Sequence, residues 1–269
     1  MVDINFDSKA TLYEQKALVQ KSAAEVLLGL VSIKEDENVL DLGCGSGRTT
    51  REIARCTKGI VVGTDISGSM IKEAISKDDG KPNISFLVKD AECLGFRDSF
   101  DVVFCNSAFQ WFSRPKKVLK QCFIALKTGG RIGIQAPATA MYCPNFVTAV
   151  EKVRNNPATK NIFGFFKNPW MFLESEGEYR SLFEKSGFEV VTCKIVKESA
   201  RYAADQVYGI YQSGAENGYL NQTFYTVPLT DAYIGTFCDL VKKAFKEQAD
   251  ESGIVNLTFN RIYLVAKKP

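Results

Sequence analysis

The sequence predicts an α/β protein: a doubly wound sheet of seven mostly parallel strands, with a helical cap formed by insertions. Short apolar runs alternate with amphipathic segments over residues 38–135, which is typical of a parallel sheet with helices on both faces. The first run contains a carboxylate and is followed by three glycines at alternate positions. Because ligands of such sheets bind at the carboxyl ends of the strands, this turn is the expected binding site.

The expected elements follow this alternation along the chain. Seven apolar runs are expected to be strands: 39–42, 59–65, 84–88, 100–105, 129–135, 188–196 and 255–266. Helices are expected at 8–31 with Ser8 as N-cap, after Arg48, after Ser67, and over 114–126, 176–186, 201–212 and 230–249. A turn at Lys127–Gly130 is expected to lead into the fifth strand.

The same pattern predicts the division of the chain. An N-terminal helical segment is expected over 1–36 and the ligand-binding core over 37–136. Residues 137–177 and 200–252 are too aromatic for linkers, so they are expected to be cap insertions, and 178–199 and 253–269 should supply the final strands.

The turn from Gly43 to Gly47 has a spacing that limits the ligand. Glycine lacks a Cβ, so the backbone can adopt positive φ and a ligand can approach the peptide groups. In the dinucleotide fingerprint a third glycine follows the second by three residues, and here Arg48 occupies that place. A nicotinamide or flavin dinucleotide is therefore disfavoured.

Polar residues also follow the next three expected strands. Asp65 ends the second strand, where a carboxylate can accept hydrogen bonds from both hydroxyls of a ribose. Asp90 and Ala91 follow the third strand and are placed to meet the edge of an adenine. The segment from Asn106 to Trp111 follows the fourth strand.

These four motifs, in this order over residues 39–111, resemble the class I S-adenosylmethionine-dependent methyltransferases. The resemblance implies a Rossmann-like methyltransferase fold and S-adenosyl-L-methionine as cofactor, with S-adenosyl-L-homocysteine as product. Met70 could lie against the adenine or simply fill a gap in the core. The residues that the resemblance assigns to the cofactor are Asp41, Gly43, Cys44, Gly45, Gly47, Asp65, Ile66, Met70, Asp90, Ala91 and Asn106.

The segment from Asn106 to Trp111 favours a carboxylate as methyl acceptor. A carboxylic acid is already ionised at neutral pH and needs no base, and the chain has no histidine. A lysine, tyrosine or acid elsewhere could still serve as base for another acceptor. Gln110 and Trp111 offer N–H donors that could hold a carboxylate, or they could anchor their own loop.

The segment Ala10–Gln15, which contains Tyr13, resembles malonyl-acyl-carrier-protein O-methyltransferases and, less closely, trans-aconitate methyltransferases. The Asn-x-x-x-Gln-Trp motif ending at Trp111 resembles both of these families and also the juvenile-hormone-acid methyltransferases. The resemblance implies Tyr13, Gln110 and Trp111 as catalytic residues, although Tyr13 could instead pack on the core. It also implies a small-molecule or acyl-carrier-bound carboxylate as partner. An N-, C- or S-directed small-molecule methyltransferase and a catalytically silent cofactor-binding protein are the alternatives.

The composition of the chain limits the expected partners, location and cysteine chemistry. The 269 residues are 45% hydrophobic and 24% charged, and the net charge of +3 is spread along the chain, so no nucleic-acid or membrane partner is expected. Without a signal-like apolar segment the protein is expected to be cytoplasmic. The eight cysteines form no CxxC pair, so free thiols and no metal site are expected rather than a redox or metalloid site. The oligomeric state stays open.

One basic run interrupts the even spread of charge. Arg114, Lys116, Lys117 and Lys120 would lie on one helix. They could receive an acidic carrier protein or simply form a solvated face.

Overall fold

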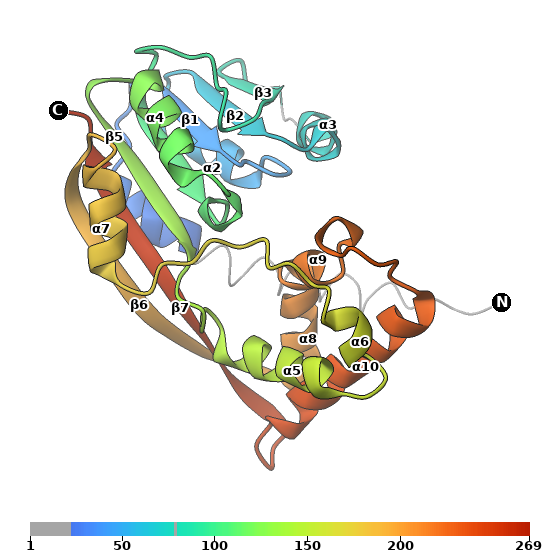
Figure 1. Cartoon of the computed structure of the whole chain (residues 1–269). Coiled ribbons are helices and arrows are strands. Elements are labelled where there is room, and N and C mark those ends of the chain that lie inside the picture. Colours follow the sequence, from blue (N-terminus) through green and yellow to red (C-terminus); the bar gives the residue numbers. More distant parts are fainter. Residues whose placement is uncertain (1–22, 78–79) are drawn as a thin grey trace. The chain divides into compact units, whose positions relative to one another are not determined.

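The computed structural model describes residues 23–77 and 80–269 (Figure 1). The chain divides into two compact units. The larger unit comprises the described part of Ser22–Ala140 together with Trp170–Val196 and Arg261–Pro269, and the smaller unit includes Met141–Pro169 and Lys197–Asn260. The smaller unit includes most residues of the two expected insertions. Residues 170–177, however, belong to the larger unit, and residues 253–260, expected among the final strands, belong to the smaller unit.

A seven-stranded sheet runs in the order β3-β2-β1-β4-β5-β7-β6. Its strands are β1 (Val39–Leu42), β2 (Val61–Asp65), β3 (Ile84–Val88), β4 (Phe100–Asn106), β5 (Leu126–Pro137), β6 (Glu189–Ala203) and β7 (Ile254–Lys267). The pairs from β3 through β5 are parallel and β7 is antiparallel to β5, which confirms the predicted sheet. The strand order reverses between β1 and β4, so a crevice is expected at their carboxyl ends.

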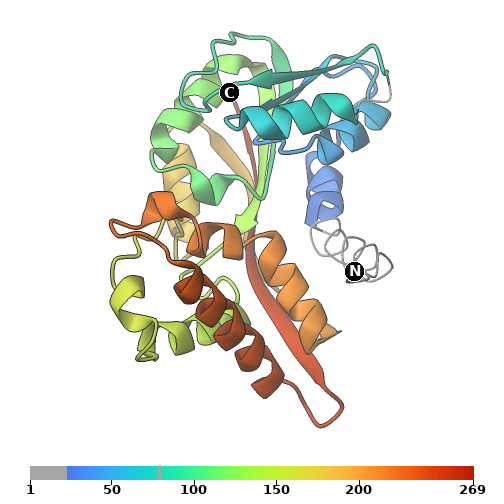
Figure 2. The same cartoon turned by 90° about the vertical axis from the view of Figure 1, so that its right-hand side faces the viewer.

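Helices cover both faces of the larger unit's sheet (Figure 2). On one face, α4 (Pro115–Ala125) and α7 (Glu176–Glu184) bury Leu119 and Phe183. On the other, the helical residues 23–31 and α2 (Arg48–Cys56) bury Leu27 and Ile53. The helix α3 (Gly68–Ser76) packs on Phe86 of β3. The doubly wound arrangement is therefore confirmed.

Two strands are longer than the sequence predicts. β5 begins at Leu126, which pairs with Phe100 before an irregular register, so the expected turn at Lys127–Gly130 lies inside the strand. β6 continues to Ala203, and the helix expected from residue 201 starts later. A hydrogen bond of 2.8 Å joins the hydroxyls of Ser199 in β6 and Thr258 in β7. Pairing with a neighbouring strand thus extends a sequence that is too polar to predict a strand.

The smaller unit is mainly helical and has an aromatic core. Its helices are α5 (Pro144–Asn155), α6 (Lys160–Phe163), α8 (Ala204–Ser213), α9 (Glu216–Tyr219) and α10 (Asp231–Glu247), with the 3-10 turn η2 (Gln222–Phe224). The Phe146 ring lies 5.2 Å from Tyr211 and 5.7 Å from Phe245, measured between centroids, and so joins α5, α8 and α10. Within the described residues, no helix combines the length and the apolar character that crossing a membrane requires.

Candidate active site

The glycine turn after β1 adopts the backbone that its sequence predicts. Gly43, Gly45 and Gly47 have φ of 75°, 54° and 75°, in the left-handed region that favours glycine. A Cβ on Gly43 would lie 2.4 Å from the Cβ of Ala108, whereas a Cβ on Gly45 would meet no atom within 4 Å. Gly43 therefore permits close packing within the protein, and Gly45 borders open space.

Asp65 at the end of β2 holds the glycine turn in place. Its two carboxylate oxygens accept hydrogen bonds from the backbone N–H groups of Gly45 and Ser67, both at 2.9 Å. Ser67 in turn caps α3 by accepting a hydrogen bond from the N–H of Met70. Each carboxylate oxygen keeps a further acceptor site, so Asp65 can still bind the hydroxyls of a ligand.

Asp41 lies beneath the turn rather than at its surface. The residue is 2% exposed, and its Oδ2 accepts a hydrogen bond of 2.6 Å from the hydroxyl of Thr50 in α2. Burial raises the pKa of Asp41 to about 7, opposed by the Thr50 hydrogen bond and increased by the charge of Asp65. Asp41 is thus placed to support the turn from below.

The side chain of Cys44 is partly buried, and its Sγ lies 3.7 Å from the carbonyl oxygen of Gly45 in the same turn. Its side chain packs against the small apolar cluster formed by Ile71, Ala74 and Phe86. Burial raises the pKa of the Cys44 thiol well above its ordinary value, which disfavours the reactive thiolate form. The backbone N–H of Cys44 donates to the carbonyl of Thr64 at 2.9 Å.

The residues predicted to surround an adenine lie beside Asp65. Ile66 is 73% exposed and Met70 is 43% exposed, so each leaves apolar surface uncovered. The N–H of Lys89 donates to the carbonyl of Asp65 at 2.9 Å, which brings the end of β3, with Asp90 and Ala91, to the end of β2.

The segment after β4 is held in a strained turn. Ser107 has a φ of 57°, and its N–H and hydroxyl both hydrogen-bond to Gln135 of β5, at 2.8 Å and 3.0 Å. Asn106 precedes this turn, and its Oδ1 is buried with no hydrogen-bond partner among the described residues. A buried acceptor of this kind indicates a donor supplied by a ligand or by water.

Gln110 and Trp111, in the 3-10 turn η1 (Phe109–Trp111), occupy different environments. Gln110 is 7% exposed, its side-chain Nε2 donates to the carbonyl of Ser107 at 2.9 Å, and its backbone carbonyl accepts from the N–H of Met171. Its side-chain Oε1 is buried with no hydrogen-bond partner among the described residues. This is the loop-anchoring arrangement that the sequence left open. Trp111 is 39% exposed and meets Trp170 edge-to-face, with 5.6 Å between ring centroids.

Three residues of this site were missed by the sequence analysis: Thr50, Gln135 and Trp170. Their partners lie on other elements, so no local motif marks them; the aromatic content of residues 136–177 was the one available signal for Trp170. Tyr13, predicted to be catalytic, lies outside the described residues. All eight cysteines are free, with Cys56 and Cys93 exposed, and the described residues contain no cluster suited to a metal ion.

Comparisons with known proteins find methyltransferases. A family model described as a methyltransferase domain matches residues 39–130. Malonyl-[acyl-carrier protein] O-methyltransferase 1 of Ilyobacter polytropus is 31% identical over 143 residues, which are 52% of this chain and 53% of that protein. Trans-aconitate 2-methyltransferase of Deinococcus radiodurans is 32% identical over 127 residues, 47% of this chain and 48% of that protein. The chain spans about half the length of the curated relatives it matches.

Solved structures share the fold over most of the chain. A Bacillus halodurans C-125 protein assigned as a methyltransferase aligns with a TM-score of 0.63 at 18% identity, covering 92% of this chain and 99% of that one. Phosphoethanolamine N-methyltransferase 2 of Haemonchus contortus, solved with S-adenosyl-L-methionine, aligns with a TM-score of 0.54 at 19% identity, covering 91% and 52%. The chain therefore contains a methyltransferase domain with the fold of the class I S-adenosylmethionine-dependent methyltransferases.

Proposed function

We propose that the protein transfers a methyl group from S-adenosyl-L-methionine to a carboxylate of a small molecule or of a carrier-bound acyl group, giving a methyl ester. The observation that supports this cofactor is the hydrogen bond between Gly45 and Asp65. There a glycine backbone that borders open space lies beside a carboxylate that can accept further hydrogen bonds. The names of the relatives support the acceptor, since malonyl groups and trans-aconitate both carry carboxylates.

The residues at the strand ends fit this cofactor. Bound S-adenosyl-L-methionine supplies a methyl group attached to a sulfonium sulfur, and the neutral thioether is a good leaving group. We assign Gly43, Cys44, Gly45 and Gly47 to its methionine portion through their backbone, with Asp41 supporting them. The orphaned Oδ1 of Asn106 suits the cofactor's ammonium group as donor. Asp65 would bind the ribose, and the adenine would lie among Ile66, Met70, Asp90 and Ala91.

The acceptor side needs positioning and dry surroundings more than acid–base chemistry. An ionised carboxylate needs no base, so the chain's residues have to orient it and exclude water. The exposed indole of Trp111 can donate its N–H to an acceptor oxygen, and Trp170 holds its ring. Gln110 keeps a second amide N–H besides the one given to Ser107. We assign Gln110 mainly to positioning this loop. We also assign Gln110 and Tyr13 to contacts with the acceptor.

The experiment is methyl transfer from labelled S-adenosyl-L-methionine to a panel of acceptors. The panel contains a malonyl thioester on an acyl carrier protein, free malonate, trans-aconitate, a fatty acid, a phenol, an amine and a thiol. Mild alkali then releases ester-bound label as methanol. Alkali-labile label on an acid is the expected result.

Two other results would contradict the proposal in different ways. Alkali-stable label on the amine, thiol or phenol would indicate another acceptor class with the same cofactor. Cofactor binding by calorimetry without transfer to any acceptor would favour a silent cofactor-binding protein.

A further inference from the structure

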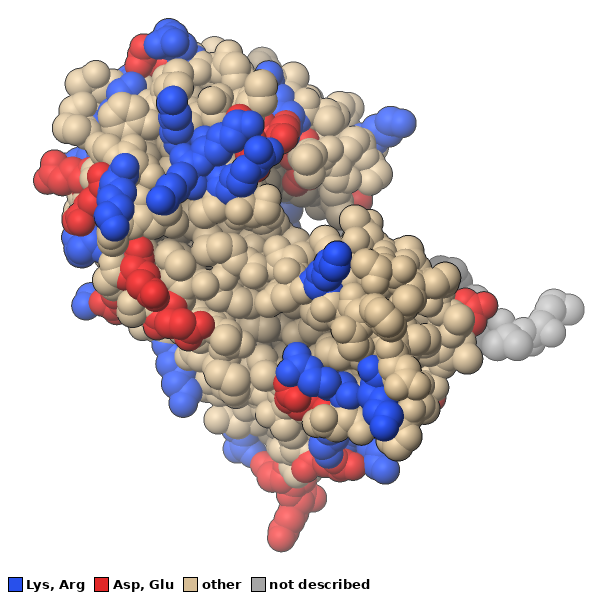
Figure 3. Space-filling model, viewed as in Figure 1, with Lys and Arg blue, Asp and Glu red and all other residues tan. Residues whose placement is uncertain are grey.

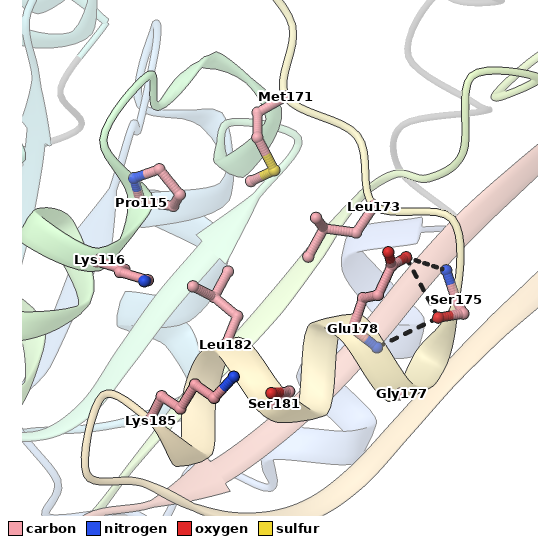
Figure 4. Close-up of a pocket in the computed structure, with 10 residues that line it drawn as sticks. All are labelled: Pro115, Lys116, Met171, Leu173, Ser175, Gly177, Glu178, Ser181, Leu182 and Lys185. Atoms are coloured by element: carbon pink, nitrogen blue, oxygen red, sulfur yellow. Dashed lines mark hydrogen bonds between the residues drawn. The ribbon is translucent and has the colours of Figure 1, made fainter.

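A groove on the larger unit lies outside the cofactor site. It has a volume of about 480 Å3 and runs between the start of α4, the segment after Trp170 and α7 (Figure 4). Met171, Leu173 and Leu182 point toward one another and form its apolar floor. Lys116 and Lys185 stand at one side of this floor, and Glu178 and Ser175 stand at the other.

The cations at and near the groove differ in whether they pair with a carboxylate. Arg114 and Lys117 both pair with Glu92, so that acid is already shared. Lys116 and Lys185, which line the groove, form no ion pair with any described residue. The carboxylate of Glu178 accepts hydrogen bonds from the N–H groups of Glu174 and Ser175, at 2.8 Å and 3.0 Å, in the capping box of α7. Figure 3 shows Lys and Arg side chains gathered at the level of α4.

The stability of α4 does not explain this charge. Arg114, Lys116 and Lys117 surround its N-terminus, whose first turn holds no acid, and cations at a helix N-terminus oppose the helix dipole. Lys116 and Lys120 also repel each other, because residues four apart share a helix face. These positions cost α4 stability, which is understandable if the cations serve a partner.

We propose that this groove docks an acidic amphipathic helix of a carrier protein that presents the acceptor as a thioester. Aliphatic side chains of that helix would pack on Met171, Leu173 and Leu182, and its carboxylates would face Lys116 and Lys185. Helix-in-groove docking of this kind combines an apolar floor with charges at the edge. The inference rests on the proposed function, because it assigns a delivery surface to the same acceptor site.

The groove adjoins the acceptor side of the site along the chain. Met171 directly follows Trp170, whose ring meets Trp111, and the N–H of Met171 donates to the carbonyl of Gln110 at 2.8 Å. Pro115, at the other edge of the groove, comes shortly after Trp111 in the chain. These links place the groove next to the tryptophan pair, where we assign the acceptor.

The test uses malonyl-loaded acyl carrier protein as probe and reverses the charge of the groove with the double variant K116E/K185E. Charge pairs across an interface govern association and weaken in salt. We expect at least tenfold weaker binding of the fluorescently labelled carrier, and at least a tenfold lower kcat/KM for the carrier-bound malonyl group. Transfer to the small malonyl thioester of N-acetylcysteamine should not change, which also shows that the variant is folded.

Two variants serve as controls. K116R/K185R keeps the charge at the groove and should bind the carrier like the unaltered protein. K243E/K246E makes the same change in net charge on α10, where both lysines are exposed, and should leave carrier binding unchanged.

The outcomes separate this inference from the proposed function. If the unaltered protein binds no carrier, or if K116E/K185E and K243E/K246E weaken binding equally, the docking surface is wrong, even where free acids are methylated. If no carboxylate is methylated in any form, the proposed function fails, and with it the delivery role of the groove, whatever the carrier binding shows.

Discussion

Asp41 is a carboxyl group buried inside the sheet, and it should give the protein a distinctive pH dependence. Its pKa rises from an ordinary value of 3.8 to about 7 on folding, mainly through burial. Between these values the folded state keeps a proton that the unfolded chain has lost, so raising the pH lowers the free energy of unfolding. This contribution amounts to about 1.4 kcal/mol for each pH unit within that range. Above pH 7 both states are ionised and the penalty is constant.

The variant Asp41→Asn should remove this dependence. An asparagine can still accept the Thr50 hydrogen bond through its amide oxygen, but it does not titrate. Urea unfolding at pH 4.5, 5.5 and 6.5 should show the unaltered protein losing stability relative to the variant as the pH rises. Parallel curves for the two proteins would mean that Asp41 ionises near its ordinary pKa.

Tyr211 in the smaller unit is a second buried polar group with a cost. Its side chain is fully buried in the aromatic core, and its hydroxyl has no hydrogen-bond partner among the described residues. Tyr211→Phe should therefore stabilise the protein by about 1 kcal/mol, since a buried unpaired group loses its hydration without compensation. Tyr233→Phe is the matched control, because the Tyr233 hydroxyl lies 3.1 Å from that of Tyr225. Calorimetry should show the first variant melting above the unaltered protein and the second below it.

In the glycine turn between β1 and α2, Gly45 borders the open space in which we expect the ligand. Gly45→Ala places a methyl group in open space, at a strain of about 1–2 kcal/mol for a left-handed backbone. We expect the variant to fold but to bind S-adenosyl-L-methionine at least tenfold more weakly in calorimetry, because the methyl group enters the ligand's space. Gly253→Ala imposes the same strain, at a φ of 76° with open space around it, and should leave binding unchanged. Equal affinity of the two variants for S-adenosyl-L-methionine would show that the ligand does not lie against Gly45.

The sequence alone predicts a strand or helix where local sequence signals set both of its ends. β3 matches its expected limits because turn signals bound its apolar run, and the glycine turn, Asp65 and Asn106 stand where strand ends place them. The start of β5 and the end of β6 depend on pairing with neighbouring strands, so periodicity does not reveal them. The orientation of Gln110 was likewise open, because a sequence does not tell which carbonyl an amide meets.

Cofactor binding should stabilise the protein through mass action. S-Adenosyl-L-methionine at a hundred times its Kd should raise the free energy of unfolding by about 2.7 kcal/mol. Asp65→Ala removes charge-assisted hydrogen bonds worth about 2 kcal/mol of affinity, so the same concentration should stabilise the variant far less. Asp36→Ala, an exposed carboxylate before β1, is the control. Scanning calorimetry with and without the cofactor measures the stabilisation of the unaltered protein and of the two variants. Equal shifts in melting temperature in all three proteins would contradict the role of Asp65.

The position of β7 in the sheet has a consequence for synthesis on the ribosome. β7 follows the other six strands in the chain, yet it lies between β5 and β6. Nascent chains generally fold from their N-terminal part first. Here β6 emerges before the strand that must separate it from β5, so it has to wait without its sheet partner. The side of β5 that β7 will pair stays an open edge until then, a period in which a chaperone would protect the nascent protein from aggregation and slow translation would prolong the exposure.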